Sequence, residues 1–315
     1  MRTRITFCAL VLAATSGWGA ARTLPGPAFP RYADPAALEA ACGTNLATVQ
    51  AAVKRLERRK ADGAWLAAYD DINALAEDLA GPIYLLSNVH PDKPMRDASE
   101  ACELRWQDFL STLGQNEKLY KAARQLKARD AIDRELVKTT LEGFEDAGVS
   151  LPLAQRQRAK AIQDRITELG QAFDKNIRDA NTRVAFTEAE LEGVPDSVWK
   201  TAKRDADGRV LLGLDYPTYG PVLELARNGA ARERMWRAKQ SEGGEPNLKL
   251  LGEIARLRLE YAQLFGFKSY ADFTLRRRMA ENTTKAKRFL EEVRVAVAER
   301  EKREPARILE VNTLA

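Results

Sequence analysis

Histidine is nearly absent from this sequence of 315 residues, and its scarcity limits the chemistry that the chain can perform. The single histidine, His90, precedes Pro91 and is expected in a loop, as a surface or helix-capping residue. As a general base it would need a hydrogen-bonded partner that the sequence does not identify. A zinc-binding H-E-x-x-H motif needs two histidines one helical turn apart, so the sequence contains no such motif.

Other catalytic signatures are missing as well. The sequence has neither a G-x-S-x-G nucleophile elbow nor a Walker phosphate loop, and Gly243-Gly244 is a lone flexible pair. The paired carboxylates Asp70-Asp71 and Glu291-Glu292 are ordinary for helix surfaces. We therefore expect no catalytic residue and no metal ligand in this chain, and the sequence identifies no substrate-binding residue.

Strand-type alternation of apolar and polar residues is also scarce, whereas Ala, Leu, Glu, Arg and Lys dominate and favour helix. With 45% hydrophobic and 30% charged residues, the chain is expected to be globular. We predict an all-α fold of mainly long helices. One small β-hairpin is expected near residues 205–216, where Asp207-Gly208 supplies a turn and Val210 begins a strand.

Apolar runs long enough to span a bilayer are lacking. The run from Ile5 to Thr15 follows the basic residues Arg2 and Arg4, and small residues precede a cleavage site after Ala21. This pattern predicts a signal peptide over residues 1–21 and an exported protein, periplasmic or secreted. The alternative is the start of a cytoplasmic helix.

Strong charge of one sign is absent too. Loss of the signal peptide would lower the formal net charge from +5 to +3, and no stretch interleaves aromatic residues with a basic stripe. We therefore expect no nucleic-acid partner and no membrane span. The clusters Arg58-Arg59-Lys60 and Arg276-Arg277-Arg278 are interpreted as solvated surfaces.

Cysteine is rare, with three in the whole sequence. Cys8 lies inside the predicted signal peptide, whereas Cys42 and Cys102 lie in predicted helices. An exported compartment permits a disulfide between Cys42 and Cys102. Alternatively, both are small buried apolar residues.

The clearest helix covers residues 247–265, and its apolar stripe includes Leu250, Ile254, Leu257, Tyr261 and Leu264. The stripe is broad, which predicts packing on two or more neighbours. Gly266 is placed as a left-handed C-cap, and Thr283 or Thr284 is expected to cap a last helix over 284–309. Arg258, at the edge of the stripe, is either a rim residue or a buried arginine held by a carboxylate.

The rest of the chain also reads as helix. Steps of three and four from Ile162 to Ile177 predict a helix of nearly 30 residues that Ser150 caps. The remaining predicted helices are 35–59, with a candidate break at Cys42-Gly43-Thr44; 64–86, with a candidate interruption at Gly81-Pro82; 100–113; 117–128; 131–147; one or two short ones in 187–203; 222–227; and 231–239. A loop is expected over 88–94.

Three blocks carry a resemblance to a known family. The block from Leu257 to Phe267 has the pattern L-R-x-E-x-A-x-L-x-G-F and is followed by Ser269-Tyr270-Ala271 and Arg278-Met279-Ala280. The other two blocks are 143–177 and 215–238. Together they resemble the thimet oligopeptidase family of zinc metallopeptidases, which includes oligopeptidase A, the bacterial dipeptidyl carboxypeptidases and neurolysin.

The resemblance implies a neurolysin-like helical lobe, truncated, with an N-terminal helical domain over 22–225. Residues 226–315 would begin the peptidase domain but lack its zinc-binding part. The family uses zinc and cleaves short peptides in a channel between two helical lobes. The implied function is the N-terminal segment of an exported zinc-dependent oligopeptidase, inactive alone. The choice between endopeptidase and dipeptidyl carboxypeptidase stays open.

A second function from another class is a stand-alone helical protein, derived from that family, that binds peptides or a partner helix. The sequence leaves open whether this chain is itself an enzyme and what its oligomeric state is. The two hypotheses differ in the surfaces of the 247–265 and 284–309 helices. A complete fold should cover them, and a fragment should expose a large apolar patch.

Overall fold

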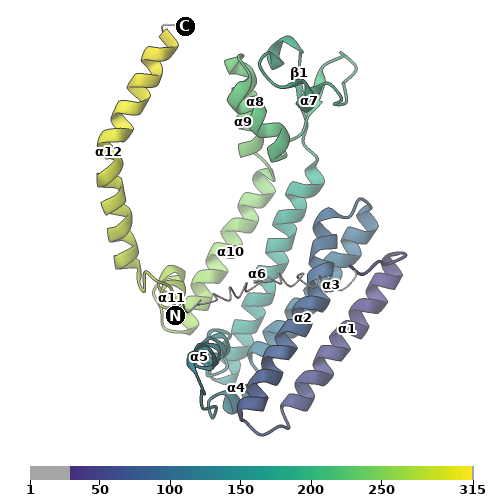
Figure 1. Cartoon of the computed structure of the whole chain (residues 1–315), viewed down its shortest axis with the longest axis vertical. Helices are drawn as coiled ribbons and strands as arrows, with labels where there is room; N and C mark the ends of the chain where they lie inside the picture. The colour runs from purple at the N-terminus through teal and green to yellow at the C-terminus, as the bar shows by residue number, and fades with distance from the viewer. Residues whose placement is uncertain (1–28, 314–315) are drawn as a thin grey trace, which may run out of the picture.

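The computed structural model describes residues 29–313, with side chains to residue 304, and confirms the predicted all-α class (Figure 1). The predicted signal peptide lies outside the described residues. The elements are α1 (Pro35–Leu56), α2 (Gly63–Val89), α3 (Lys93–Gly114), α4 (Glu117–Ala123), α5 (Ala131–Asp146), α6 (Leu153–Ala180), β1 (Val184–Phe186), η1 (Ala189–Leu191), α7 (Asp196–Trp199), β2 (Val210–Leu212), α8 (Tyr216–Leu225), α9 (Gly229–Gln240), α10 (Gly244–Leu264), α11 (Tyr270–Leu275) and α12 (Thr283–Thr313).

The N-terminal helices α1, α2 and α3 pack side by side, and α6 lies against α3 (Figure 1). Their shared core includes the buried side chains of Leu38, Val49, Trp65, Ile83 and Trp106. Side-chain caps explain where the helices start. Asp34 accepts a 2.8 Å hydrogen bond from the Ala37 amide, and Asp62 accepts bonds from the first turn of α2.

The candidate breaks in the first two helices are wrong, since α1 continues through Gly43 and α2 continues through Pro82. Buried neighbours such as Ile83 and Leu86 hold α2 in the bundle, and tertiary packing outweighs the local cost of the proline. The predicted loop over 88–94 is shorter than expected, because α3 begins at Lys93 with Pro94 in its first turn. A first-turn proline loses no helical hydrogen bond.

A small mixed module covers residues 184–240 and has its own hydrophobic core, which includes Phe186, Leu191, Val210, Leu212 and Met235. The predicted strand at Val210 is present, but its ladder partner differs from the expected hairpin. β2 pairs antiparallel with β1, with Val184 opposite Leu212, while a bridge from Arg204 to Val210 closes the Asp207-Gly208 turn. The apolar segment Val184–Phe186 pairs with β2 because its buried side chains join the module core, whereas the residues before the Asp207-Gly208 turn are mostly polar.

The helices α6 and α10 form an antiparallel pair, and the module is connected between their adjacent ends (Figure 1). Arg158 pairs with Glu260 at one end, and Arg165 pairs with Glu253 further along. Asn181 ends α6 with φ 44°, and Gly243 precedes α10 with φ 76°. The predicted long helix is confirmed, but Ser150 does not cap it, since Pro152 takes the N-cap position.

The C-terminal elements pack on the lower end of α10. Gly266 is left-handed, with φ 80°, as predicted. Asn282, rather than Thr283 or Thr284, caps α12 by accepting a 2.9 Å hydrogen bond from the Lys285 amide. Beyond its first turn, α12 diverges from the rest of the molecule (Figure 1). The predicted domain division at residues 225 and 226 stays a prediction.

Candidate functional site

The single histidine does not form part of a metal centre in the described residues. His90 is the C-cap residue of α2, and its Nδ1 accepts a 3.1 Å hydrogen bond from the Asp92 amide. Across residues 29–304, no group of three or more His, Cys, Asp or Glu side chains is arranged to hold a metal ion. The paired carboxylates Asp70-Asp71 and Glu291-Glu292 lie on exposed helix surfaces.

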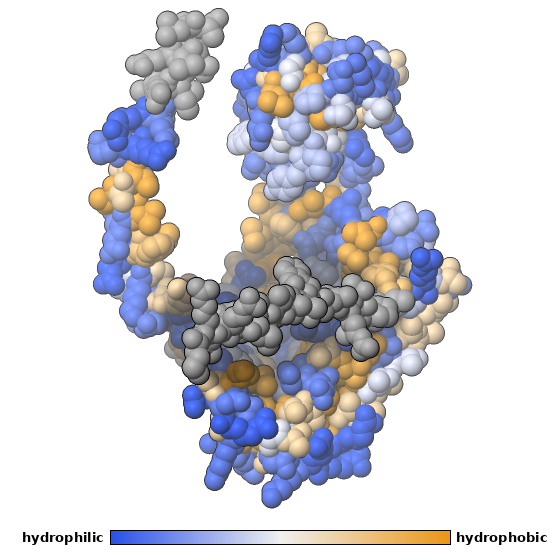
Figure 2. Space-filling view, in the orientation of Figure 1, coloured by the Kyte–Doolittle hydropathy of each residue, from blue (hydrophilic) through white to orange (hydrophobic). Residues whose placement is uncertain are grey.

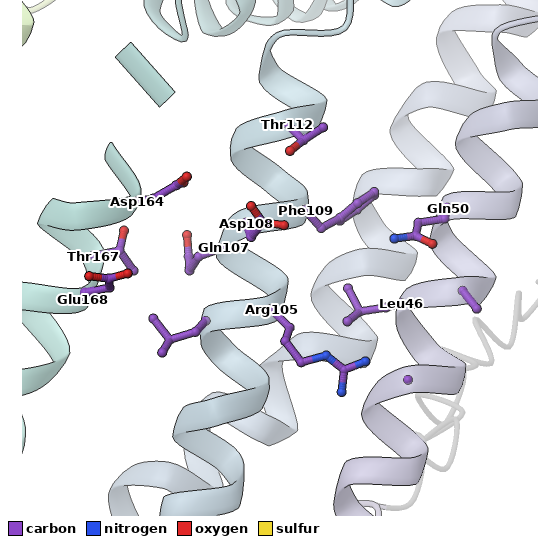
Figure 3. Close-up of a pocket in the computed structure, with 13 residues that line it drawn as sticks. Leu46, Gln50, Arg105, Gln107, Asp108, Phe109, Thr112, Asp164, Thr167 and Glu168 are labelled. Atoms are coloured by element: carbon purple, nitrogen blue, oxygen red, sulfur yellow. The ribbon is translucent and has the colours of Figure 1, made fainter. Parts of the chain in front are cut away.

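A groove of about 640 Å³ runs across α3, between α1 and α6. Figure 3 shows side chains of α6 facing Gln107 and Asp108, while Arg105 and Phe109 extend toward α1. Its labelled lining residues are Leu46, Gln50, Arg105, Gln107, Asp108, Phe109, Thr112, Asp164, Thr167 and Glu168. The groove offers carboxylates, amides and one guanidinium, which suits binding of a polar segment.

The acidic side of this groove is neutralised by a lysine. Lys160 Nζ lies 2.5 Å from Asp108 Oδ1 and 2.7 Å from Asp164 Oδ2. Burial acts to lower the pKa of Lys160, but its hydrogen bonds to the two carboxylates raise the pKa above the usual value. A lysine held in its charged form bridges helices and is a poor proton acceptor. The groove therefore has the character of a binding surface.

Cys42 and Cys102 are joined by a disulfide beside this groove, with their Cα atoms 6.0 Å apart. Both side chains are buried, and the bond connects α1 to α3. The neighbouring Gly43 lines the groove, and an added Cβ there would lie 3.6 Å from the Arg105 guanidinium. The disulfide thus fixes the spacing of two helices that form the groove wall.

A second polar network joins α3 to α6. Glu103 accepts hydrogen bonds from Ser87 and from Gln171, and burial raises the pKa of Glu103 despite them. Nearby, hydrogen bonds from Lys175 and Lys93 lower the pKa of Asp97 to about 2. These groups connect α2, α3 and α6, and their chemistry is that of helix-to-helix ion pairing.

In the arginine run that follows α11, Arg278 is exposed as predicted, whereas Arg276 and Arg277 are not the solvated residues that the sequence suggested. Arg277 pairs with Glu142 at 3.0 Å, Glu145 at 2.8 Å and Asp146 at 2.9 Å, all on α5. Arg276 pairs with Asp146 and lies 3.8 Å from the centre of the Phe273 ring. Burial raises the pKa of Asp146 although both arginines act to lower it. The carboxylates are too distant in sequence for the pattern to reveal them.

The broad apolar stripe of α10 is covered on one side only. Ile254, Tyr261 and Ala262 are buried, and Tyr261 and Ala262 share a core with Ala159 and Ile162 of α6. The other side of the stripe is exposed at Leu248, Leu251 and Leu259. The predicted packing on two neighbours is confirmed, since α10 packs on α6 and α11, but part of the stripe stays uncovered. Arg258 is the rim residue, exposed and 5.4 Å from the Tyr270 ring centre.

A second uncovered apolar face lies on α12. Its exposed large side chains are Phe289, Leu290, Val293, Val295 and Val297, and Phe289 is 62% exposed. Figure 2 shows apolar side chains gathered midway along α12 and, across a wide concave space, beside α10. We call these two surfaces the α10 face (Leu248, Leu251, Leu259) and the α12 face (Phe289, Leu290, Val293, Val297). Contiguous exposed apolar surface of this kind marks an interaction site.

Comparisons with known proteins identify relatives of this chain among the oligopeptidases. Residues 222–313 match the model of peptidase family M3. The chain is 34% identical to oligopeptidase A of Escherichia coli (strain K12) over 246 residues, which are 71% of this chain and 36% of that protein. It is 33% identical to oligopeptidase A of Salmonella typhimurium over 286 residues, 83% of this chain and 41% of that protein. Saccharolysin of Saccharomyces cerevisiae is 31% identical over 237 residues, 69% of this chain and 33% of that protein. The chain spans about a third to two fifths of the length of these relatives.

Proposed function

This chain belongs to peptidase family M3, and we propose that it is the N-terminal segment of an oligopeptidase that cleaves short peptides. Its similarity to two bacterial oligopeptidases A over most of its length supports this proposal. The observation that carries it furthest is the pair of exposed apolar faces on α10 and α12, which border one concave space (Figure 2).

The proposed role of these faces is to form part of the wall against which a peptide or the remaining helices of the enzyme pack. An extended peptide offers apolar side chains and unpaired backbone groups, and an apolar wall with a polar rim can hold both. On α10, the exposed Arg256 can supply part of such a rim, whereas Glu253 and Glu260 pair with arginines of α6. The endopeptidase and dipeptidyl carboxypeptidase alternatives are both compatible with this surface.

Zinc is the cofactor that the family implies, and the residues of this chain do not fit it. A His₂Glu zinc site requires two imidazoles, and the sequence has one histidine, whose Nδ1 already accepts a backbone hydrogen bond. We therefore assign no zinc ligand to residues 1–315 and propose that the chain alone does not hydrolyse peptides.

We further propose that the protein is exported, on the strength of the signal-peptide pattern in residues 1–21. A helix able to span a membrane was not found among the residues that the structure describes. N-terminal sequencing of the protein from its source cells should give a chain that starts at Arg22. A chain that retains Arg2 and Arg4 in the cytoplasmic fraction would contradict export.

The native mass of the species that carries this chain tests the function. An antibody against residues 29–304 should detect, in the exported fraction, a polypeptide much larger than 35.1 kDa. Its cleavage of short peptides should stop when a zinc chelator is added, and the purified chain alone should show no cleavage. Chelator-sensitive hydrolysis by the purified chain would overturn the proposal.

The second candidate is a stand-alone protein that binds a peptide or a partner helix. The α12 face favours it, because an amphipathic helix can dock its apolar stripe against such a surface. A native species with the mass of residues 22–315 alone would make this candidate the first choice.

A further inference from the structure

The small module between α6 and α10 contains a pocket of about 430 Å³ that no proposed step of peptide cleavage uses. It lies against the face of β2 that carries Leu211 and Gly213, and its lining also includes Leu212, Val198 and Ala202 of the module core. Its lining residues are Asn181, Arg183, Val198, Thr201, Ala202, Lys203, Leu211, Leu212, Gly213 and Thr218.

The register of the sheet places two cationic residues on this face. Val184 is opposite Leu212, so Arg183 is opposite Gly213 at the next position. On the other edge of β2, the bridge from Arg204 to Val210 places Lys203 opposite Leu211, whose amide donates a 2.8 Å bond to the Lys203 carbonyl. Side chains alternate along a strand, and residues opposite each other share a face.

Gly213 leaves the space between the two cations open. A Cβ at this position would lie 2.5 Å from Arg183 Nη1 and 2.8 Å from Asp215 Oδ2, so the guanidinium crosses the bare backbone of the glycine. Asp215 Oδ2 therefore lies on the same side of Gly213 as the guanidinium, while Asp215 Oδ1 accepts a 3.1 Å hydrogen bond from the Thr218 amide as the α8 N-cap. A larger residue at 213 would displace Arg183.

The two cations differ from most other arginines of the module, although Arg232 also donates only to backbone carbonyls, those of Ala226 and Arg227. Arg204, Arg209, Arg227 and Arg234 each pair with a carboxylate at 2.6 to 2.9 Å. Arg183 and Lys203 form no ion pair with any residue that the structure describes. Two cations with a single carboxylate, Asp215, beside them leave a net positive charge at the pocket, and the resulting local potential favours an anion.

The rest of the lining indicates which chemical groups the bound anion has. The hydroxyls of Thr201 and Thr218 can donate hydrogen bonds to an oxyanion, and the arginine fork matches carboxylate or phosphate oxygens. Val198, Ala202 and Leu211 provide an apolar side that can contact a small aliphatic group. We propose that this pocket binds a small oxyanion, a carboxylate or phosphate, beside a small apolar group.

Calorimetric titration of the purified chain tests the site with three probes: N-acetyl-alanyl-alanine, its C-terminal amide, and inorganic phosphate. We expect saturable binding of the free carboxylate or of phosphate, and none of the amide. The double variant Arg183→Gln/Lys203→Gln should weaken that binding by about tenfold or more. Binding of the peptide acid alone identifies a peptide C-terminus as the source, and binding of phosphate alone identifies free phosphate.

A matched double variant, Lys200→Gln/Arg209→Gln, removes the same charge from residues of the module that pair with Asp196 and Asp205, and it should bind normally. Gly213→Ala keeps both cations but fills the pocket, and should also lose binding. Gly213→Ala therefore provides a second test of the site if the first double variant does not fold. The experiment measures binding only, so failure of the peptidase proposal does not affect it. Absence of saturable binding for both anions, or equal weakening in the matched variant, overturns the site.

Discussion

Asn176 of α6 donates a 2.8 Å hydrogen bond from its Nδ2 to Oδ1 of Asn247 on α10, close to the point where the module joins the two helices. Asn247 is buried and donates its own Nδ2 to the Phe173 carbonyl at 3.0 Å. Gly243 must lack a side chain here, since a Cβ would come within 2.1 Å of Asn247 Nδ2. These hydrogen bonds fix the axial position of α10 relative to α6.

Replacing Asn247 with alanine should therefore destabilise the chain. The change removes two hydrogen bonds and leaves the Asn176 amide without its acceptor, so we expect the free energy of unfolding to fall by about 1–3 kcal/mol. Urea denaturation followed by circular dichroism measures it. Asn45→Ala, in the middle of α1, is the control and should stay within about 0.5 kcal/mol of the parent. Equal losses in the two variants would contradict the role of Asn247.

Reduction of the Cys42–Cys102 disulfide should lower stability markedly. The bond closes a loop with a sequence separation of 60, for which the chain-entropy estimate is about 4 kcal/mol. Denaturation midpoints with and without a reductant, together with thiol counting under denaturing conditions, check this. The variant Cys42→Ala/Cys102→Ala should unfold at the same midpoint in both buffers. Two free thiols in the native protein would show that the cysteines are unpaired.

Alkaline pH should lower the free energy of unfolding by ionising Tyr261. Burial raises the pKa of Tyr261 to about 12, and its hydroxyl donates a hydrogen bond to the Asp146 carbonyl. The unfolded chain releases this proton near pH 10. The stabilisation is therefore complete below about pH 10 and is lost as the pH rises to about 12, a change of roughly 3 kcal/mol.

The free energy of unfolding, measured for the parent and for Tyr261→Phe from about pH 8 to 12, isolates this effect, because phenylalanine does not ionise. Tyr84→Phe changes an exposed tyrosine and should keep the pH dependence of the parent. Parallel curves for the parent and Tyr261→Phe would refute the assignment.

The arginines that follow α11 should contribute unequally to the stability of the fold. Arg277→Gln breaks ion pairs with three carboxylates of α5 and should cost about 2 kcal/mol, between the values for exposed and buried pairs. Arg278→Gln, at the exposed neighbour, should change the stability by no more than about 0.5 kcal/mol. Thermal denaturation at low and high salt compares them. Similar midpoints for the two variants would argue that the cluster is solvated after all.

The α12 face should bind a hydrophobic dye in the folded state, because its large apolar side chains are exposed. Phe289→Glu should reduce the dye fluorescence by roughly half without shifting the unfolding midpoint, since the side chain packs on little. Lys287→Glu, on the same helix, is the charge control. If the parent binds no more dye than a compact globular protein, the face is covered in solution.

The sequence was sufficient for most of the helical fold because apolar periodicity and caps are local signals. The α6 helix, the left-handed Gly266 and the strand at Val210 were predicted from neighbouring residues alone. The errors arose where distant packing decides the structure. Pro82 stays inside α2, and the partner of β2 is a segment more than twenty residues earlier.

The surfaces were harder to predict for the same reason. The groove across α3 combines residues from α1, α3 and α6, and no single stretch of sequence carries its pattern. Arg277 looked solvated because Glu142 and Asp146, which neutralise it, are more than a hundred residues away. The exposure of Leu248 could not be read from periodicity, which shows that a helix has an apolar side but not what covers it.

The position of the module between Asn181 and Gly243 has a consequence for how this chain can change over evolutionary time. The chain leaves α6 and returns to α10 at neighbouring points, so the two helices form a hairpin whose connection is a folded unit. The unit has its own core, and the helical pair is held by its own contacts. Substitutions and insertions outside its pocket can therefore accumulate in the unit without disturbing the packing of α6 on α10.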